Sequence, residues 1–355
     1  MSESNSFYQQ LEANSQRLFY LLDGFQEPKI LVVGDLALDE FISGEVERLS
    51  REAPVLILRH EETVQIPGGG GNAVYNLAKL GAQVKVAGLV GEDPQGEALR
   101  NIFVEAGVDT EGIISVRDRA TVTKTRISGH ARQSVTQQIV RLDRKSQHPP
   151  DPFCIPQIAQ YVKENATEVD AVVCSDYGDG VLSSPVIEAT LNHPCTIVDA
   201  QSNLSRYQGA TLFTPNLPEA ESAVGYSINN ENLLQQAGQD LLHLTQAQYI
   251  LMTRGEEGMT LFTRTGETYH IPPFNRTDVF DVTGAGDTVV AALTISLCAG
   301  ATPWEAAVLG NLAASIVVRQ FGTATTNIAE MKLGLQTLLD DPSLLADRIP
   351  PNPPY

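Results

Sequence analysis

Residues 281–288, Asp-Val-Thr-Gly-Ala-Gly-Asp-Thr, place a carboxylate at the start of an expected helix whose first turn carries almost no side chain. The backbone N–H groups left open are those of Gly284, Ala285 and Gly286. They lie at the positive end of the helix dipole, where a phosphate is favoured. Asp287 would repel that phosphate unless its carboxylate takes a proton from the attacking group. The pattern predicts phosphoryl transfer with Asp287 as general base; the structural alternative is an ordinary helix capped by Thr283.

A second group of polar side chains follows the apolar run 211–213, which we expect to be a strand. Open α/β folds bind ligands at the carboxyl ends of their strands. Asn216 and Glu219 are three residues apart, so both would lie on one face of the helix that starts there. Their oxygens suit Mg²⁺ held mostly through water. The alternative is structural, with Asn216 capping the helix and Glu219 completing a capping box.

The sequence gives a less direct indication of how a nucleotide would be bound than of where a phosphate would lie. The chain has no G-x-x-x-x-G-K-[ST] sequence, so that glycine-rich loop is excluded. Residues 253–258, Thr-Arg-Gly-Glu-Glu-Gly, follow another apolar run. Either they form a tight hairpin turn, or their glycines let the backbone approach a nucleotide.

Four consecutive glycines, residues 68–71, precede an expected helix at residues 72–80. A flexible loop is the plain interpretation, but four glycines cost backbone entropy without a gain in packing. Close approach of the backbone to a polyhydroxyl substrate explains them better. Asp35 and Asp39 follow the first apolar run, and their carboxylates could accept hydrogen bonds from sugar hydroxyls or only occupy turns.

Charge and hydropathy exclude some classes of partner. The 355 residues include 24 basic and 43 acidic side chains, for a net charge of −19. Such a surface repels nucleic acid and anionic membranes, so a phosphorylated ligand needs local positive groups. No stretch reaches the roughly 18 apolar residues that span a bilayer, and the polar N-terminus does not resemble a secretory signal. We expect a cytoplasmic protein with a small-molecule partner and neither nucleic acid nor membrane.

Four cysteines are spread over the sequence: Cys154, Cys174, Cys195 and Cys298. They are too far apart along the chain for a CxxC metal or redox pair, and three lie in apolar runs. Free thiols with a structural role are therefore expected.

Strand and helix patterns alternate along most of the chain. Short apolar runs bounded by turn residues indicate the strands, at residues 30–33, 84–90, 171–174, 196–198, 211–213 and 249–252. Helical patterns separate most of them, which favours an α/β fold with a largely parallel sheet covered on both faces. Thr302 and Glu305 form an expected capping box, which opens a helix running towards Arg319.

Two regions break this alternation. Residues 41–66 and 121–143 contain strand-like runs without helices between them, which indicates a small antiparallel sheet projecting from the body. We expect residues 1–27 to form an N-terminal helical extension, residues 28–340 one domain that includes this sheet, and residues 341–355 an extended proline-rich tail.

Residues 281–288 resemble the C-terminal signature of the PfkB, or ribokinase-like, carbohydrate kinases, and Asn216 and Glu219 match the family's N-x-x-E motif. The resemblance implies a three-layer αβα sandwich with a mostly parallel central sheet and a small β-sheet lid over the sugar. It also implies ATP and Mg²⁺ as cofactors and a homodimer through the lid sheet. Many relatives use a monovalent ion beside this loop, which here would be K⁺ near Asp281 and Thr283.

The resemblance also carries ligand roles onto positions of this sequence. The residues near the nucleotide phosphates and ribose would be Thr253, Gly255 and Gly258. Asn311 corresponds to a position near the adenine, although it could equally lie on the surface. The sugar would be held at Asp35, Asp39, Gly69, Gly70 and Asn72.

Within the family, the sequence is most similar to the kinases for D-glycero-D-manno-heptose 7-phosphate, the kinase half of bifunctional ADP-heptose synthesis proteins. Supporting stretches include residues 48–54, 139–143 and 175–180. This similarity puts four cations on the lid, where a sugar phosphate would need them, unless they are merely solvated: Lys124, Arg126, Arg132 and Arg141. One departure is Asp199-Ala-Gln201, where such kinases usually carry Asp-Pro-Lys.

We therefore expect an ATP-dependent kinase acting on a sugar hydroxyl, with the anomeric hydroxyl of the heptose phosphate as acceptor. Two alternatives stay open. One is a kinase for another sugar, sugar phosphate or nucleoside. The other is a sugar-binding regulator without turnover, which would have no use for Asp287 as a base.

Overall fold

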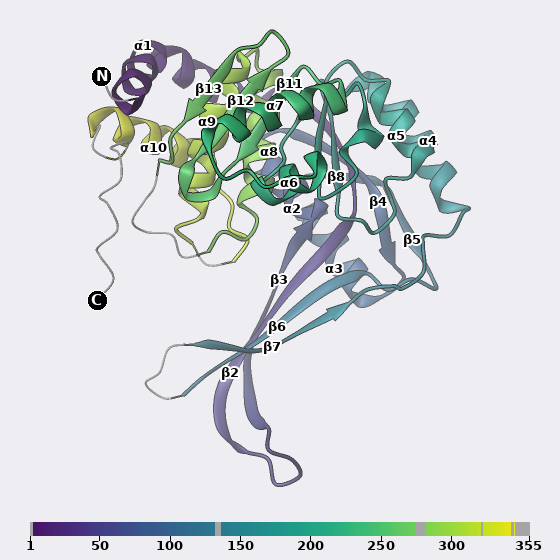
Figure 1. Cartoon of the computed structure of the whole chain (residues 1–355). Helices are drawn as coiled ribbons and strands as arrows, with labels where there is room; N and C mark the ends of the chain where they lie inside the picture. The colour runs from purple at the N-terminus through teal and green to yellow at the C-terminus, as the bar shows by residue number, and fades with distance from the viewer. Residues whose placement is uncertain (1–2, 132–135, 275–280, 321, 342–343, 345–355) are drawn as a thin grey trace.

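The computed structural model describes residues 3–131, 136–274, 281–320, 322–341 and 344. These residues form a central sheet between helices and a smaller sheet that projects from it (Figure 1). The strands of the central sheet are β1 (Lys29–Gly34), β4 (Gln83–Gly91), β5 (Asp109–Val116), β8 (Ala171–Asp176), β9 (Thr196–Ala200), β10 (Leu212–Phe213), β11 (Tyr249–Thr253), β12 (Met259–Thr263) and β13 (Thr268–Ile271). Their order is β13-β12-β11-β10-β9-β8-β1-β4-β5.

The central sheet is parallel from β5 to β11, and only β12 and β13 pair antiparallel. In β1, Ile30 and Val32 belong to the core on one side of the sheet, while Leu31 and Val33 belong to the core on the other. A strand covered on both faces needs an unbroken apolar run, which is the pattern in residues 30–33. The predicted mostly parallel sheet is confirmed.

Helices cover both faces of this sheet. One face carries α1 (Glu3–Asp23), α2 (Gly70–Lys79), α3 (Pro94–Glu105), α8 (Ala285–Cys298), α9 (Pro303–Val317) and α10 (Ile328–Asp340). The other carries α4 (Cys154–Asn165), α5 (Ser184–Leu191), α6 (Leu217–Val224) and α7 (Glu231–Thr245). The described residues thus form the expected three layers.

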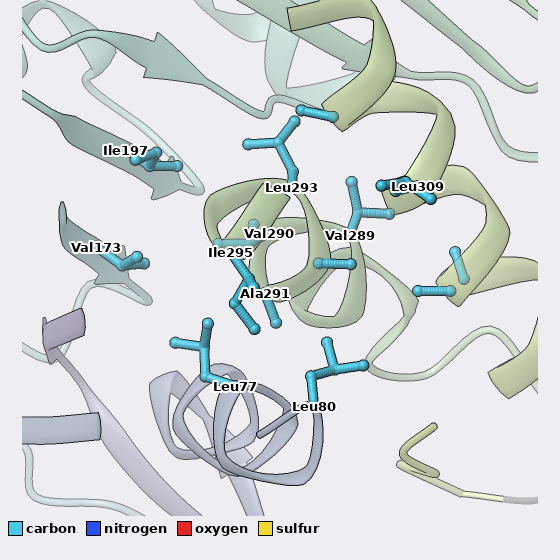
Figure 2. Packing of buried hydrophobic residues seen from close by; sticks show 14 of the residues in the cluster. Leu77, Leu80, Val173, Ile197, Val289, Val290, Ala291, Leu293, Ile295 and Leu309 are labelled. Atoms are coloured by element: carbon cyan, nitrogen blue, oxygen red, sulfur yellow. The ribbon is translucent and has the colours of Figure 1, made fainter. Parts of the chain in front are cut away.

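Helix α8 lies in the middle of the first core. Figure 2 shows it surrounded by Leu77, Val173, Ile197 and Leu309, which come from α2, β8, β9 and α9. All four side chains have no solvent exposure, and each fully buried aliphatic side chain contributes roughly 1.5–3 kcal/mol. The helix is therefore held from several sides, and so is any group at its N-terminus.

The smaller sheet, which we call the lid, has the strand order β3-β2-β6-β7. Its strands are β2 (Leu36–Leu49), β3 (Leu56–Gly69), β6 (Val122–His130) and β7 (Gln137–Arg144). The outer pairs are antiparallel, as expected, whereas β2 and β6 in the middle of this sheet run parallel, which the sequence did not predict. Strand β2 starts directly after β1, and β3 leads into α2. The lid is therefore connected to the main body at the glycine run, residues 68–71.

The N-terminal helix α1 packs on the main body. Leu11 and Leu18 have no exposure, and the Tyr8 hydroxyl donates a hydrogen bond to the Leu339 carbonyl in α10 at 2.7 Å. The predicted tail at residues 341–355 lies almost entirely outside the described residues. Within the ranges given above, no helix combines the length and apolar character required to cross a bilayer.

Candidate active site

Asp287 lies in the first turn of α8. The chain enters the helix through Gly284 in a left-handed conformation, with φ of 78°. A side chain at Gly284 would place its Cβ 2.5 Å from Nδ2 of Asn72, so only glycine fits there. At Gly286, by contrast, an added Cβ would meet no atom within 4 Å. Asp287 is only 5% exposed, yet it lines a cavity of about 160 Å³.

This cavity brings together residues from distant parts of the sequence. Six of the residues predicted from the sequence line it: Asn216, Glu219, Thr253, Gly284, Gly286 and Asp287. They come from the start of α6, the end of β11 and the start of α8. The predicted base, the predicted phosphate-binding glycines and the predicted Mg²⁺ ligands therefore share one space, as phosphoryl transfer requires.

The carboxylate of Asp287 is held by two side-chain hydrogen bonds. Asn72 Nδ2 donates to Oδ2 at 2.8 Å, and the Tyr177 hydroxyl donates to Oδ1 at 3.0 Å. Asn76 in turn orients Asn72, since its Nδ2 donates to Asn72 Oδ1 at 3.0 Å. Burial raises the pKa of Asp287 to about 6, although the two hydrogen bonds and the charge of Lys124 act to lower it. Such a carboxylate is ionised at neutral pH and still basic enough to accept a proton.

The N–H groups at the helix start are fewer than predicted. The Ala285 N–H donates to the Val282 carbonyl at 3.2 Å, so it is not open to an anion. The N–H groups of Gly284 and Gly286 have no acceptor among the described residues. Of the three N–H groups predicted to meet an anion, those of Gly284 and Gly286 therefore remain open.

Asn216 and Glu219 form the capping box that was the structural alternative. Asn216 Oδ1 accepts from the Glu219 N–H, and Glu219 Oε2 accepts from the Asn216 N–H, both at 2.9 Å. Burial raises the pKa of Glu219, against the effect of the hydrogen bonds from Asn216. The cap does not exclude a metal, because Glu219 lines the cavity and its Oε1 has no protein donor in the described part of the chain. A carboxylate oxygen in a polar cavity fits Mg²⁺ that keeps most of its water.

Residues 253–258 connect β11 to the antiparallel β12, so the hairpin interpretation is correct for the backbone. Thr253 also lines the cavity. Gly255 and Gly258 lie further along the connection, with φ of 57° and 82°. At Gly258 an added Cβ would lie 2.2 Å from the Ile271 carbonyl oxygen, so the turn itself requires this glycine. Proximity of the two glycines to a nucleotide stays a prediction.

Asn311 is not a surface residue. It is 6% exposed in α9, and its Nδ2 donates to the Pro272 carbonyl at 2.8 Å, which ties α9 to the segment after β13. Asn311 does not line the cavity of Asp287. Its predicted place near an adenine stays a prediction.

Asp35, a predicted sugar ligand, shapes the loop after β8. Its carboxylate accepts hydrogen bonds from the backbone N–H groups of Tyr177, Asp179 and Val181 at 2.9, 2.8 and 3.1 Å. Burial raises its pKa to about 6, against the hydrogen bonds from Asp179 and Val181. Asp35 therefore positions Tyr177, and through it Asp287. Contact of Asp35 with a sugar hydroxyl stays a prediction.

The glycine run, residues 68–71, also contacts Asp35. The Gly70 N–H donates to the Asp35 carbonyl at 2.9 Å, and Gly69 adopts φ of 53° directly before α2. Asn72, two residues into this helix, directs its amide to Asp287. The run thus joins the lid to the predicted base. Gly69 has a positive φ that favours glycine, and an added Cβ there would make a tight contact of 3.0 Å with the Asp35 carbonyl oxygen.

One face of the lid carries the predicted phosphate-binding cations. Asp39 lies opposite Lys124, and Arg126 opposite Arg141, so all four side chains share a face. Arg126 Nη1 lies 3.0 Å from Asp39 Oδ1 in a largely buried pair, and Arg141 pairs with its neighbour Asp143 at 2.7 Å. Lys124 has no carboxylate oxygen within 4.0 Å among the described residues. Its Nζ lies 5.7 Å from the Tyr177 ring centroid.

The fourth predicted lid cation, Arg132, lies outside the described residues. Asp281, predicted to lie beside a monovalent ion, accepts hydrogen bonds from the N–H groups of Thr283 and Gly322 at 2.9 and 3.1 Å. Burial acts to raise the pKa of Asp281, but hydrogen bonds from these two residues outweigh it and lower the pKa. Asp281 thus ties the start of α8 to the segment after α9, and the ion stays a prediction.

Five cavity residues had no predicted role: Asp176, Tyr177, Asp199, Gln201 and Thr214. Burial, and then the charges of Asp287 and Glu219, raise the pKa of Asp199 well above its ordinary value. The described lining contains four acidic residues and neither lysine nor arginine. These carboxylates repel an anion, so an anion can enter the cavity only when cations accompany it. All five lie at or after the carboxyl ends of β8, β9 and β10, and this position is the signal that could have found them.

Comparison with known proteins identifies relatives that match most of this chain. The bifunctional protein HldE of Desulfatibacillum aliphaticivorans is 41% identical over 318 residues, which cover 88% of this chain and 64% of that protein. HldE of Trichlorobacter lovleyi (strain ATCC BAA-1151 / DSM 17278 / SZ) is 42% identical over 309 residues, or 85% of this chain and 62% of that protein. The chain thus spans less than two thirds of the length of these relatives.

Two solved structures have the same fold. Arabidopsis thaliana ribokinase complexed with ribose and ATP superposes with a TM-score of 0.65 at 20% identity, covering 89% of this chain and 99% of that one. Escherichia coli phosphofructokinase-2 in complex with potassium gives 0.69 at 20% identity, covering 88% and 100%. A model of the pfkB family carbohydrate kinases matches residues 27–330. The chain therefore belongs to the pfkB family of carbohydrate kinases, as residues 281–288 had indicated.

Proposed function

We propose that this chain transfers the γ-phosphoryl group of ATP to the anomeric hydroxyl of D-glycero-D-manno-heptose 7-phosphate, giving a 1,7-bisphosphate. The observation that carries the proposal is Asp287, a buried carboxylate with a pKa of about 6 that lines a cavity. The N–H groups of Gly284 and Gly286, which have no acceptor among the described residues, lie beside it. The heptose acceptor is supported by the resemblance to heptose phosphate kinases and by the HldE relatives.

Asp287 acts as general base. Its ionised carboxylate takes the proton of the acceptor hydroxyl as the hydroxyl oxygen attacks the γ-phosphorus and ADP leaves. The hydrogen bonds from Asn72 and Tyr177 fix the orientation of the carboxylate, so its free lone pairs point in a defined direction. Both donors satisfy the ionised form, which is the form that can accept a proton.

The open N–H groups of Gly284 and Gly286 bind the phosphoryl oxygens on which charge develops. They lie at the N-terminus of the 14-residue helix α8, whose dipole favours negative charge there. Because Gly286 has open space where a side chain would be, the backbone can approach the phosphate closely. These groups offset the repulsion from Asp287.

Glu219, with Asn216 fixing it in the capping box, is the residue that would hold Mg²⁺ through water. When bound, Mg²⁺ supplies positive charge to the phosphate oxygens of ATP. The chemistry of the acidic cavity fits this cation, since its lining is rich in carboxylates. We also assign K⁺ to the loop at Asp281 and Thr283, by analogy with the phosphofructokinase-2 crystallised with potassium.

The lid recognises the acceptor. Lys124, Arg126 and Arg141 share the face that also carries Asp39, and Lys124 lies beside Tyr177 next to the predicted base. We assign the 7-phosphate to these cations, because the protein as a whole is acidic and offers a phosphate no general attraction. The sugar itself would lie beside Asp39 and the glycine run, which are in contact with each other.

The lid also supplies the surface for a second copy of the chain. Val140 and Leu142 on β7 are 49% and 57% exposed, which is unusual for neighbouring apolar side chains on one strand face. We propose a homodimer through this sheet. Light scattering would then give twice the 38.4 kDa of one chain, and the double change Val140→Asp with Leu142→Asp would give one chain.

A panel of acceptors tests the function. ADP release is measured with the heptose 7-phosphate, the same heptose without its phosphate, fructose 6-phosphate, ribose and adenosine. We expect kcat/KM for the heptose phosphate to exceed every other value by at least about tenfold, since a site built for a phosphate rejects an acceptor lacking it. Turnover only with unphosphorylated sugars would remove the heptose phosphate. Sugar binding by calorimetry without any ADP release would favour the regulator.

A further inference from the structure

Two cysteine thiols meet at the end of α8 that lies far from the cavity. Cys298 is the last residue of α8, and Cys195 directly precedes β9. The thiols of Cys195 and Cys298 lie within hydrogen-bonding reach of each other, and both side chains pack against the core that surrounds α8. The sequence spacing gave no sign of this pair, because the two residues are far apart along the chain.

The course of β9 along α8 explains the contact. Side chains alternate along a strand, so Cys195, Ile197 and Asp199 point to the same side of the sheet. Ile197 packs against α8 in the core shown in Figure 2. At one end of this row, the charge of Asp287 in α8 helps to raise the pKa of Asp199. Cys195, at the opposite end of this row, therefore lies next to the C-terminal end of α8.

The dimensions of the two elements agree with this arrangement. From Cys195 to Asp199 the strand covers roughly 13 Å, at 3.3 Å per residue. From Asp287 to Cys298 the helix covers about 16 Å, at 1.5 Å per residue. Helix and strand run in opposite directions, so the carboxylates meet at the cavity and the thiols meet at the opposite end.

The other two cysteines differ from this pair. Cys195 and Cys298 are partly exposed, whereas Cys154 and Cys174 are buried. Burial raises the pKa of Cys174 to about 12 and also raises that of Cys154. The hydrogen bond between the two thiols lowers the pKa of Cys195, and the thiolate is the reactive form of cysteine. Only this pair combines contact, exposure and an ionisable member among the four thiols.

We propose that Cys195 and Cys298 form a redox-active pair, which hydrogen peroxide or another small hydroperoxide converts into a reversible disulfide. The bond would join the far ends of β9 and α8, the two elements whose cavity ends carry Asp199 and Asp287. The pair is thus a modification site separate from the residues that touch the phosphates.

The chemistry balances as follows. The Cys195 thiolate attacks a peroxide oxygen, an S–O bond forms, the O–O bond breaks, and hydroxide leaves with the bonding electrons. That hydroxide takes the proton of Cys298. The new Cys298 thiolate attacks the sulfenic sulfur of Cys195, forming the S–S bond and releasing a second hydroxide, which takes up the proton that Cys195 had lost. Two thiols lose two electrons, and peroxide is reduced to two waters.

The first test maps the bond in the full chain. The protein is treated with a small excess of hydrogen peroxide, alkylated in denaturant and digested. We expect the peptides of Cys195 and Cys298 to be joined, with loss of two hydrogen atoms, while Cys154 and Cys174 are alkylated. Dithiothreitol should restore alkylation of all four. Cys154→Ser is the matched control and should still form the bond.

The second test follows the consequence for stability. The bond restricts the unfolded chain by closing a long loop, so oxidation should raise the melting temperature of the protein by a few degrees. Cys298→Ser should show no such rise, and peroxide should instead leave a sulfenic acid on Cys195 that dimedone traps. Should Cys298→Ser fail to fold, iodoacetamide kinetics on the unaltered protein at pH 7 give the same information, with Cys195 reacting at least about tenfold faster than Cys174.

The proposal is overturned by any of three results. One is absence of the joined peptides after oxidation. Another is oxidation of Cys154 or Cys174 before the pair. The third is an equal rise in melting temperature for Cys298→Ser, or equal iodoacetamide rates for Cys195 and Cys174.

Discussion

The main body buries Asp287, one of the charged groups that line the cavity, whereas the lid leaves part of its charge exposed. Asp287 is 5% exposed, and Asn72 and Tyr177 both donate hydrogen bonds to it. The Arg141 side chain is 44% exposed and pairs with Asp143, two residues away on the same strand. Burial shifts the pKa of Asp287 to about 6 and fixes its position, which suits a proton acceptor.

The lid charges suit recognition instead. An exposed ion pair contributes only about 0–1 kcal/mol, so Arg141 can exchange Asp143 for a substrate phosphate at little cost. Arg126 lies between these two cases, because it belongs to the lid but its ion pair with Asp39 is largely buried. The comparison therefore predicts that changes in the body alter turnover or folding, while changes on the lid alter acceptor binding.

The largest expected effect is that of Asp287→Asn. Without a group that can take the proton, turnover should fall by at least about a hundredfold, the scale of a lost general base. ATP binding by calorimetry and the circular dichroism spectrum should match those of the unaltered protein, because the side chain keeps its size. Turnover within about threefold of the parent would defeat the assignment.

Gly284→Ala and Gly286→Ala form a matched pair that tests how rigid the body is. At Gly284 the new methyl group would clash with Asn72, and alanine would have to adopt the left-handed backbone conformation that glycine has there. The free energy of unfolding should therefore fall by roughly 2 kcal/mol or more. Gly286→Ala has open space, and alanine favours the helix, so stability should stay or rise by up to about 1 kcal/mol. Urea unfolding measures both, and equal losses would contradict the close approach at Gly284.

On the lid, Lys124→Met and Arg141→Ala compare a cation that has no ion pair among the described residues with one that is paired. Lys124→Met should raise KM for the phosphorylated acceptor about tenfold, the loss of one charge-assisted hydrogen bond of about 1.4 kcal/mol. Arg141→Ala should raise it less than about threefold, because Arg141 is exposed and already paired. Steady-state kinetics at pH 8 should show kcat within about threefold for both. A large fall in kcat with unchanged KM would place Lys124 in the chemistry instead.

Much of the fold follows from local signals. Residues 30–33 form an unbroken apolar run because β1 is buried on both faces. Thr302 and Glu305 form the predicted capping box, which depends only on residues three apart. The parallel pairing of β2 with β6 could not be predicted in this way. It depends on which distant strands meet, and neither strand carries that information alone.

The candidate site shows the same division between residues with local signals and residues placed by long-range contacts. Gly284 and Asp287 were found because a side-chain-free helix start beside a carboxylate is a local pattern. Tyr177 was missed because its hydroxyl reaches Asp287 only through a loop that Asp35 shapes from another strand. The burial of Asn311 likewise depends on a partner outside its own helix. Residue types therefore predicted the chemistry, while long-range contacts decide how each group is held.

The pH dependence of kcat/KM tests most directly whether Asp287 is the base. The ionised carboxylate is the active form, so kcat/KM should fall as the pH drops through about 6. The Tyr177 hydrogen bond lowers the pKa of Asp287, so Tyr177→Phe should move this acidic limb to higher pH by about half a unit or more, the scale of one hydrogen bond. A limb that stays in place or moves to lower pH in Tyr177→Phe would contradict the account.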